Sequence, residues 1–301
     1  MRHLTPLTYI DAIARAGSIR KAAETLAITS TALNRRVLAL EEELGVQIFE
    51  RLPRGVRLST AGELLIHYIR TQSSDFERLK SRIADLAGER RGHVAIACSQ
   101  ALLPYFLPEQ IAAYRAQHPR VTFSVLLRDR AAAEQALVDH SVDLALVFEP
   151  VRLSEVQVIA TVRQAVHAVM ARDHPLAQAS SVRLTACAEY PLALPTLDYG
   201  VRHLIDLALR RSSVDLEPVV ESDSFEFLRR LPAHEQIIGF QVPIGLPAQD
   251  GIDGIVTRRL DRRDVPEGML YLGQLRGRTL PVAAAKFASQ VERTLVDRYG
   301  G

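Results

Sequence analysis

Residues 18–63 constrain the fold of this chain most, because two short helical patterns follow each other there across a tight turn. In the first pattern, apolar residues recur at helical spacing over 19–26, behind Ser18 as the expected N-cap. In the second, Thr29 is placed to cap a helix. Its expected apolar stripe is Leu33, Val37, Leu40 and Leu44. The turn over 27–29 has the length typical of a helix-turn-helix.

The second pattern also carries a polar face, made of Ser30, Thr31, Asn34 and Arg35 at about 100° per residue. Hydroxyls, an amide and a guanidinium near a helix N-terminus can reach base edges and phosphates in a major groove. An ordinary solvated face is the alternative. A basic hairpin follows, with Arg51, Arg54 and Arg57 spaced around Gly55. The arginine fork suits phosphates or the minor groove, so the hairpin favours the DNA-binding interpretation.

This stretch resembles the N-terminal winged helix-turn-helix of the LysR-type transcriptional regulators. The matching segments are GS at 17–18, AAETL at 22–26, AL at 32–33, LEEELG at 40–45, IFER at 48–51 and LSTAG at 58–62. The sequence Thr29-Ser30-Thr31 stands where Ser-Gln-Pro is usual, so the glutamine that often reads a base is missing and base preference does not transfer. The residues expected to contact double-stranded DNA are Ser18, Arg20, Thr29, Ser30, Thr31, Asn34, Arg35, Arg51, Arg54 and Arg57.

After the hairpin a long helix is expected, which begins with Thr60 and Glu63 at the spacing of a capping box. Its apolar residues recur as an unbroken heptad seam. So narrow a stripe calls for a partner helix, and an operator with two-fold symmetry needs two reading heads, so we expect a homodimer. Packing against the chain's own C-terminal part is the alternative. The family implies antiparallel pairing of this helix, and a tetramer. The expected dimerisation residues are Leu65, Ile69, Phe76, Leu79, Ile83 and Leu86, with Gln72 as a polar member.

After a hinge-like break at Gly88–Gly92, strands and helices alternate. Strands over 94–97, 121–127 and 144–148, with helices over 102–117 and 131–139, predict a parallel βαβαβ unit. After Pro150 a second set is expected, with strands near 155–162, 165–170, 192–194, 217–221 and 237–241 and helices near 200–211 and 224–231. Residues 258–266 are expected to cross back, before a closing helix over 280–298.

Two such units joined by two crossings resemble the two-lobed, periplasmic-binding-protein-like (type 2) effector domain of the same family. We therefore expect an α/β chain with an N-terminal all-α winged helix-turn-helix. The expected domains are 1–59 for DNA binding, 60–91 as the linker helix and hinge, and 92–301 for effector binding. Lobe I would comprise about 92–161 and 266–301, and lobe II about 162–265.

Ligands in open α/β sheets bind beyond the carboxyl ends of strands. This rule selects the corner at Ser99 and Gln100 and the opposing corner over 195–202, which offer polar groups to a polar or anionic metabolite. The family implies the same corners, with Glu149 also on the cleft rim. Loop capping by Ser99 and a solvated Arg128 are the alternatives. The expected effector-binding residues are Ser99, Gln100, Arg128, Phe148, Thr196, Tyr199, Gly200 and Arg202.

The sequence carries no catalytic motif and no metal-ligand spacing, so neither an enzyme nor a cofactor or metal site is expected. Cys98 and Cys187 are expected to be buried or incidental, and Asp261 and Asp264 to be solvated on an arginine-rich loop. No signal peptide or membrane-spanning run is present, so a cytoplasmic location is expected.

The sequence thus predicts a DNA-binding regulator with a small-molecule effector. A two-lobed binding protein or enzyme, using the helix-turn-helix only to oligomerise, is the first alternative. A winged-helix repressor without ligand control is the second.

Overall fold

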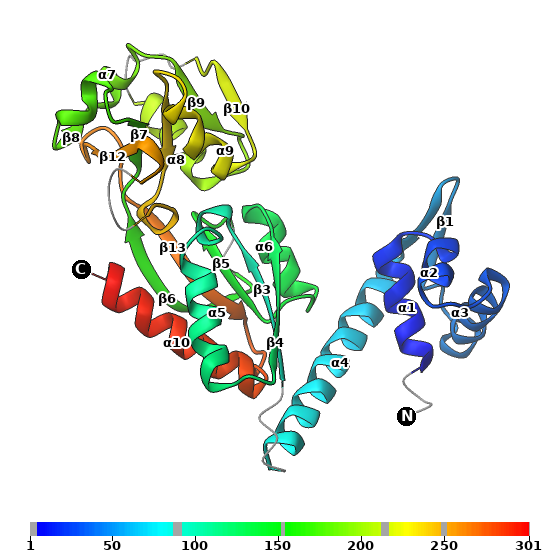
Figure 1. Cartoon of the computed structure of the whole chain (residues 1–301). Helices are drawn as coiled ribbons and strands as arrows, with labels where there is room; N and C mark the ends of the chain where they lie inside the picture. The colour runs from blue at the N-terminus through cyan, green and yellow to red at the C-terminus, as the bar shows by residue number, and fades with distance from the viewer. Residues whose placement is uncertain (1–4, 87–91, 152–153, 212–216, 248–251, 301) are drawn as a thin grey trace. The chain divides into compact units, whose positions relative to one another are not determined.

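The computed structural model describes residues 5–86, 92–151, 154–211, 217–247 and 252–300, and it divides into two compact units, Met1–Lys80 and Ser81–Gly301 (Figure 1). The first unit is a three-helix cluster followed by a hairpin and a long helix. Its elements are α1 (Thr5–Ala16), α2 (Ile19–Thr25), α3 (Ser30–Leu44), β1 (Phe49–Leu52), β2 (Gly55–Leu58) and α4 (Thr60–Leu86), which runs past the unit boundary. The expected helix-turn-helix and hairpin are confirmed.

Side-chain caps set the ends of the helix-turn-helix. The Ser18 hydroxyl accepts from the Lys21 N–H at 3.4 Å, and the Thr29 hydroxyl accepts from the Ala32 N–H at 3.2 Å, as predicted. Gly45 ends α3 in the left-handed conformation, with φ of 68°. The expected stripe of α3 holds only in part, because Leu44 is 46% exposed at the last turn, beyond the reach of the core.

The start of α4 corrects the predicted capping box by one residue. Ser59, which precedes the helix, accepts the Gly62 N–H at 3.0 Å and donates to the Gln47 carbonyl at 2.6 Å. The third helical position is therefore Gly62, which has no side chain to complete a capping box with Ser59, so the predicted pair of Thr60 and Glu63 does not form one. A Cβ at Gly62 would lie 2.1 Å from the Ile48 carbonyl oxygen, so only glycine lets α4 cross that segment so closely.

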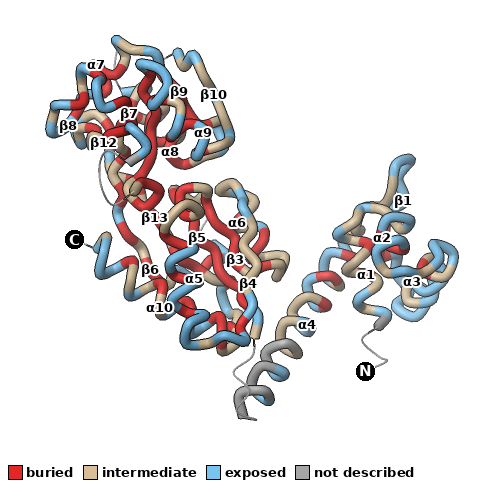
Figure 2. The backbone as a smooth tube through the Cα atoms, in the orientation of Figure 1, coloured by how far each residue is buried: buried red, intermediate tan, exposed pale blue. Residues whose placement is uncertain are grey.

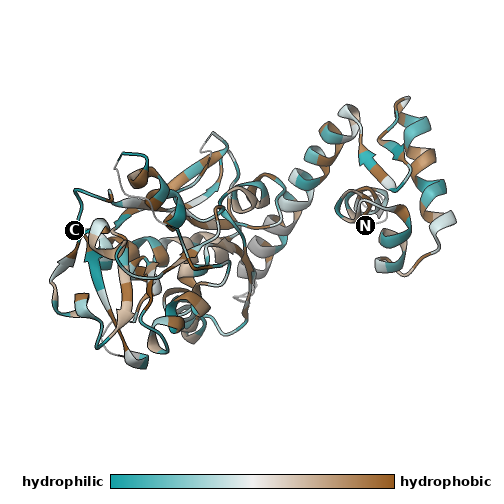
Figure 3. Ribbon diagram, turned by 90° about the horizontal axis from the view of Figure 1, so that it is seen from above, coloured by the Kyte–Doolittle hydropathy of each residue, from teal (hydrophilic) through white to brown (hydrophobic). Residues whose placement is uncertain are grey.

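The predicted dimerisation seam is wrong at its N-terminal end. Ile69 is 2% exposed in the core of the first unit, and Leu65 packs against that core. Figure 2 shows buried segments on the part of α4 that lies beside α1. Apolar side chains that remain exposed on α4 lie at Leu64, Tyr68, Leu79 and Ile83. Figure 3 shows the apolar and polar residues alternating along this helix. The side chain of Leu86, the last seam position, and most of the hinge at 88–92 lie outside the described part of the chain.

Two mixed sheets form the second unit, joined by two crossings as predicted. The first has the order β4-β3-β5-β13-β6 and the second β10-β9-β11-β7-β12-β8. The strands of the first sheet are β3 (Gly92–Cys98), β4 (Val121–Leu127), β5 (Leu144–Phe148), β6 (Val156–Gln164) and β13 (Gly268–Leu275). The strands of the second are β7 (His167–Ala171), β8 (Ser181–Val182), β9 (Leu192–Pro195), β10 (Val220–Ser222), β11 (Ile238–Gln241) and β12 (Ile255–Leu260).

Helices cover both faces of the first sheet, with α5 (Phe106–Gln117) and α10 (Val282–Tyr299) on one and α6 (Arg130–Val138) on the other (Figure 1). Every residue of β5 is therefore buried, and its side chains alternate between the two apolar clusters. The remaining helices are α7 (Leu184–Cys187), α8 (Gly200–Leu209) and α9 (Phe225–Arg230), with short 3-10 turns η2 (Gln100–Leu102), η3 (Pro175–Gln178), η4 (Leu231–Ala233), η5 (Pro243–Gly245) and η6 (Ile252–Gly254).

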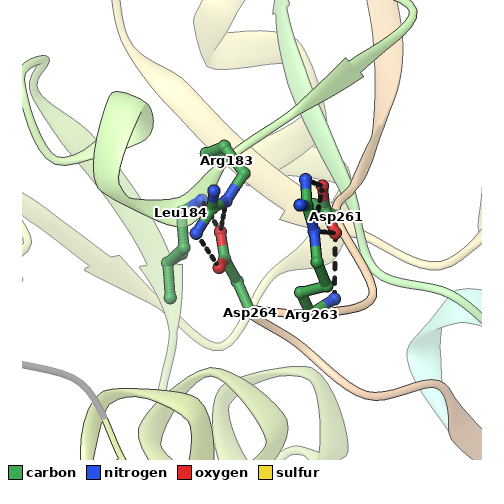
Figure 4. A network of polar contacts seen from close by, with 5 residues as sticks. All are labelled: Arg183, Leu184, Asp261, Arg263 and Asp264. Carbon is green, nitrogen blue, oxygen red and sulfur yellow. Dashed lines mark hydrogen bonds and ion pairs between the residues drawn. The ribbon is translucent and has the colours of Figure 1, made fainter.

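The strand near 155–162, expected after Pro150, is β6 and pairs with β13 in the first sheet, which agrees with the bounds expected for lobe I. Two expectations about the second unit need correction. Residues 258–260 belong to β12 and are not part of the return crossing, because they pair with β7 and β8. Asp264 is not solvated, because its carboxylate accepts two 2.7 Å hydrogen bonds from Arg183 and one from the Leu184 N–H (Figure 4). These hydrogen bonds lower the pKa of the Asp264 carboxyl. Asp261 forms an ion pair with Arg263.

Candidate functional site

The polar face of α3 is exposed. Leu33 and Val37 point into the core of the first unit, which turns the opposite face of the helix outward. Ser30, Thr31 and Arg35 are exposed, and among the described residues their side chains have no hydrogen-bond partner. The first two turns of α3 therefore offer two hydroxyls and a guanidinium to an outside ligand.

The hairpin is fixed beside the helices by two glycines. The Val56 N–H donates to the Gly17 carbonyl at 3.0 Å. A Cβ at Gly55 would lie 2.4 Å from that same oxygen, and φ of 129° at Gly55 also requires glycine. Arg51 extends from β1 and donates to the Asn34 amide oxygen at 3.2 Å. That bond links the hairpin to the polar face of α3, so the two predicted elements form one surface.

The arginines predicted to contact DNA differ in whether their side chains already pair with other residues of the protein. Arg54, between the strands, and Arg20, on α2, are exposed and have no side-chain partner among the described residues. Arg57 pairs with Glu50 across the hairpin, and the carboxylate raises the pKa of Arg57. Arg57 consequently brings less uncompensated charge than Arg54. The hydroxyls of Ser18 and Thr29 already accept cap bonds, which leaves each with a proton to donate.

A cavity of about 710 Å³ lies in the second unit, at the carboxyl ends of β4, β9 and β10. Three of the predicted effector-binding residues line it: Arg128, Thr196 and Tyr199. We call this the inter-sheet cavity, because β4 belongs to the first sheet and the other two strands to the second. The rest of its lining is Leu127, Asp129, Asp198, Glu221, Ser222 and Asp223.

Phe148, Gly200 and Ser99 do not line the inter-sheet cavity but serve packing and hydrogen bonding within the second unit. Phe148 is 3% exposed in the core, so the expectation that it lies on the rim is wrong. A Cβ at Gly200 would lie 2.6 Å from the Phe148 carbonyl oxygen, so this glycine permits close packing. Ser99 is 7% exposed; it makes no cap bond and instead accepts the Phe148 N–H at 3.2 Å, joining β3 to β5.

Gln100 and Arg202 are committed to partners within the protein. Arg202 binds Asp206 at 2.8 Å, the Pro195 carbonyl at 3.2 Å and the carboxylate of Glu221. Gln100 hydrogen-bonds to the Tyr199 hydroxyl and to the backbone at 223 and 225. Glu149, also expected on the rim, accepts the Met269 N–H at 2.6 Å and so joins β5 to β13.

Three acidic residues of the inter-sheet cavity, Asp129, Glu221 and Asp223, were not predicted from the sequence, whereas Asp198 lies in the predicted corner over 195–202. Glu221 and Asp223 lie at the end of β10, where the strand-end rule applies equally but was not used. Asp129 caps α6 by accepting the Ala132 N–H at 2.8 Å. Four carboxylates face one arginine in the lining, so an anion gains little here unless Arg128 binds it directly.

The buried cysteines and the buried histidine His174 have structural roles. Burial raises the pKa of both thiols, Cys98 and Cys187, to about 12. His174 is buried against Tyr190 and accepts the Leu176 N–H at 3.1 Å, and burial lowers its pKa. The described residues contain no cluster of three or more potential metal ligands, and none of their helices is long and apolar enough to cross a bilayer.

Comparison with known proteins places these two units in one family. Residues 4–63 match the bacterial regulatory helix-turn-helix protein model of the lysR family, and residues 87–295 match the LysR substrate binding domain. The RuBisCO operon transcriptional regulator of Allochromatium vinosum is 28% identical over 94% of this chain and 93% of its own length. These matches support the regulator interpretation and not the alternative of a binding protein or enzyme.

Solved structures share the fold. A variant of full-length OxyR from Pseudomonas aeruginosa matches with a TM-score of 0.71, at 21% identity over 96% of this chain and 94% of its own. Full-length CbnR, solved in complex with its target DNA, matches with a TM-score of 0.55 at 18% identity, over 97% of this chain and 99% of its own. This chain belongs to the LysR family of bacterial transcriptional regulators.

Proposed function

We propose that this regulator binds double-stranded DNA through the first turn of α3 and through the hairpin β1–β2. The observation that carries the proposal is the row of exposed, uncommitted polar side chains on α3 beside the exposed Arg54. Ser30, Thr31 and Asn34 suit base edges in a major groove, whereas Arg54 suits phosphate or the minor groove. Full-length CbnR was solved with its target DNA, which supports the same role here. The other proposed contacts are Ser18, Arg20, Thr29, Arg35, Arg51 and Arg57.

We further propose that a second copy of the chain covers the exposed stripe of α4. Leu64, Tyr68, Leu79 and Ile83 fall within about 100° of arc on a helix. Leu79 is 51% exposed and Ile83 57%, and two apolar residues one turn apart at the end of a charged helix suit a partner helix. Phe76, with Lys80 stacked over its ring at 5.3 Å, lies beside the stripe.

Sedimentation of the full-length chain tests this dimer. Leu79→Glu should lower the mass from a dimer, or a tetramer, towards the monomer, because a carboxylate would be buried between two apolar faces. Ser73→Glu, on an exposed position away from the stripe, should leave the assembly intact. Equal masses for wild type and Leu79→Glu would exclude the stripe as the contact.

The effector site that we propose is the inter-sheet cavity, with Arg128, Thr196 and Tyr199 as direct contacts. The regulator acts by binding alone, and a polar metabolite would bias the relative orientation of the two sheets. The carboxylates in the lining favour a neutral polar or a cationic group over the anion that the sequence suggested. Ser99, Gln100, Phe148, Gly200 and Arg202 would then act by shaping the site. We retain 1–59, 60–91 and 92–301 as the proposed domains, with lobes divided near 161 and 266.

Selection of duplexes from a random pool with the full-length protein tests the DNA-binding function. We expect related sequences with two-fold symmetry, and a changed base preference for Thr31→Ala and Asn34→Ala, because a hydroxyl and an amide on the polar face of α3 suit base edges. Ser289→Ala, exposed on α10, is the matched control and should recover the wild-type sequences. Recovery of no preferred sequence would favour a helix-turn-helix used only for oligomerisation.

A further inference from the structure

One side chain, that of Gln100, bridges the two sheets of the second unit. Gln100 begins η2, directly after β3 of the first sheet. Its Nε2 donates to the Tyr199 hydroxyl at 3.0 Å and to the Asp223 carbonyl, and its Oε1 accepts the Phe225 N–H at 2.9 Å. All three partners follow strands of the second sheet. A primary amide has two N–H donors and one carbonyl acceptor, so this side chain uses all of its polar groups across the gap.

The partners of Gln100 are held in place by contacts of their own. Ser222 Oγ accepts the Ser224 N–H at 3.0 Å, and Ser224 Oγ accepts the Phe227 N–H at 3.3 Å as the N-cap of α9. The rings of Tyr199 and Phe225 lie 5.1 Å apart, centroid to centroid. The three groups that receive Gln100 are therefore preorganised around one planar amide.

Close approaches lie on both sides of the bridge. A Cβ at Gly245 would lie 2.9 Å from the Ala101 carbonyl oxygen, so the residue after Gln100 also packs directly on the second sheet's loops. Gly200, which follows Tyr199, approaches Phe148 in the same way. Tyr199 and Asp223 also line the inter-sheet cavity. A ligand in that cavity consequently shares two of its walls with the bridge.

We propose that Gln100 is an internal latch, whose amide joins the two sheets and holds the groups for which an effector carrying an amide, or a similar donor–acceptor pair, would compete. This inference rests on the proposed effector site. Exchange of ligand for the Gln100 side chain would release one sheet from the other and convert binding into a change of orientation. The latch is a property of the chain alone, so it can be tested without an effector or DNA.

Hydrogen exchange of the full-length protein tests the latch. Gln100→Ala should speed exchange at Phe225 and over 195–201 by about tenfold, the factor expected when roughly one net hydrogen bond is lost, with β3 and β5 unchanged. Gln117→Ala, exposed at the end of α5, is the matched control and should match wild type. Wild-type exchange at Phe225 in Gln100→Ala would overturn the latch. If Gln100→Ala does not fold, Gln100→Glu replaces it as the test, because Glu keeps the acceptor for the Phe225 N–H but has no N–H donors. Exchange should then stay slow at Phe225 and become faster over 195–201 only. Wild-type exchange over 195–201 in Gln100→Glu would equally overturn the latch.

Rescue by acetamide tests whether the amide's partners can bind a ligand. Acetamide replaces the atoms that Gln100→Ala removes, so it should restore protection of both Phe225 and residues 195–201 in that variant. Sodium acetate has the acceptor but lacks the donors, so it should restore protection of Phe225 alone. Absence of rescue by acetamide, or equal rescue of 195–201 by acetate, would contradict competition at these groups. Both readouts are independent of DNA selection, so failure of the latch would leave the proposed DNA-binding function standing.

Discussion

The polar face of α3 and the polar corners of the effector unit differ in what their side chains already bind. On α3, Ser30, Thr31 and Arg35 are exposed and uncommitted among the described residues. Around the inter-sheet cavity, Ser99, Gln100 and Arg202 are bound to other parts of the same unit. A rigid surface for DNA keeps its donors free for the duplex, whereas a two-sheet sensor uses many of its polar groups to set its own conformation.

The largest expected effect separates the apolar residues of α4 into core and stripe. Ile69→Ala should lower the free energy of unfolding of the first unit by about 2–5 kcal/mol, because it empties space in a closed core. Leu79→Ala, on the exposed stripe, should leave hydrogen exchange in α1–α3 unchanged. If Leu79→Ala speeds hydrogen exchange in α1–α3 more than Ile69→Ala does, the assignment of Ile69 to the core would be wrong, and the dimerisation seam predicted from the sequence would stand.

A smaller effect should divide the effector corners into scaffold and contact residues. Ser99→Ala should destabilise the second unit by about 1–3 kcal/mol, because the buried Phe148 N–H loses its acceptor. Arg128→Ala, exposed at the cavity, should stay within about 0.5 kcal/mol of wild type. Denaturant titration of each variant measures the difference, and equal stabilities would remove the distinction.

The two units should also differ in their response to mild acid. Burial lowers the pKa of His174 in the folded state, so between the folded and unfolded pKa values the unfolded chain binds the extra proton. Stability of the second unit should therefore fall as the pH drops below about 6.5, the ordinary value for histidine. His174→Asn, which can still accept the Leu176 N–H, should flatten this dependence. An unchanged slope would exclude His174 as its source.

The smallest expected effect is the absence of thiol chemistry in the folded effector unit. Both cysteines are buried with a pKa raised to about 12, so almost no thiolate forms near pH 8. A thiol reagent such as dithionitrobenzoate should react with neither in the folded chain and with both after unfolding. Fast reaction of either thiol under native conditions would contradict their burial.

Local sequence patterns predicted the structure correctly where it depends on residues of a single helix or strand. The caps at Ser18 and Thr29 and the bounds of β4 and β5 follow from residues within a few positions of each other. The heptad pattern of α4 could not distinguish a partner helix from the unit's own core, because both select the same apolar spacing. Ile69 was therefore assigned to the dimer contact, although it lies in the core of the first unit. Strands β12 and β13 were not predicted, because they pair with strands distant in the sequence.

The candidate sites follow the same division. Exposure of the α3 face could be derived from its own helical period, once Leu33 and Val37 were assigned to the core. The roles of Gln100 and Arg202 depend on partners distant in sequence or held by another strand, such as Phe225 and Glu221. No spacing within either corner contains that information.

The salt dependence of DNA binding tests the central claim most directly. For the full-length protein on its selected duplex, Arg35→Ala and Arg54→Ala should each weaken binding and lower the slope of log K against log salt by roughly one, since each removes a phosphate contact. Arg120→Ala, exposed before β4, matches them in charge and should keep the wild-type slope. Unchanged slopes for both Arg35→Ala and Arg54→Ala would mean that α3 and the hairpin do not face the duplex.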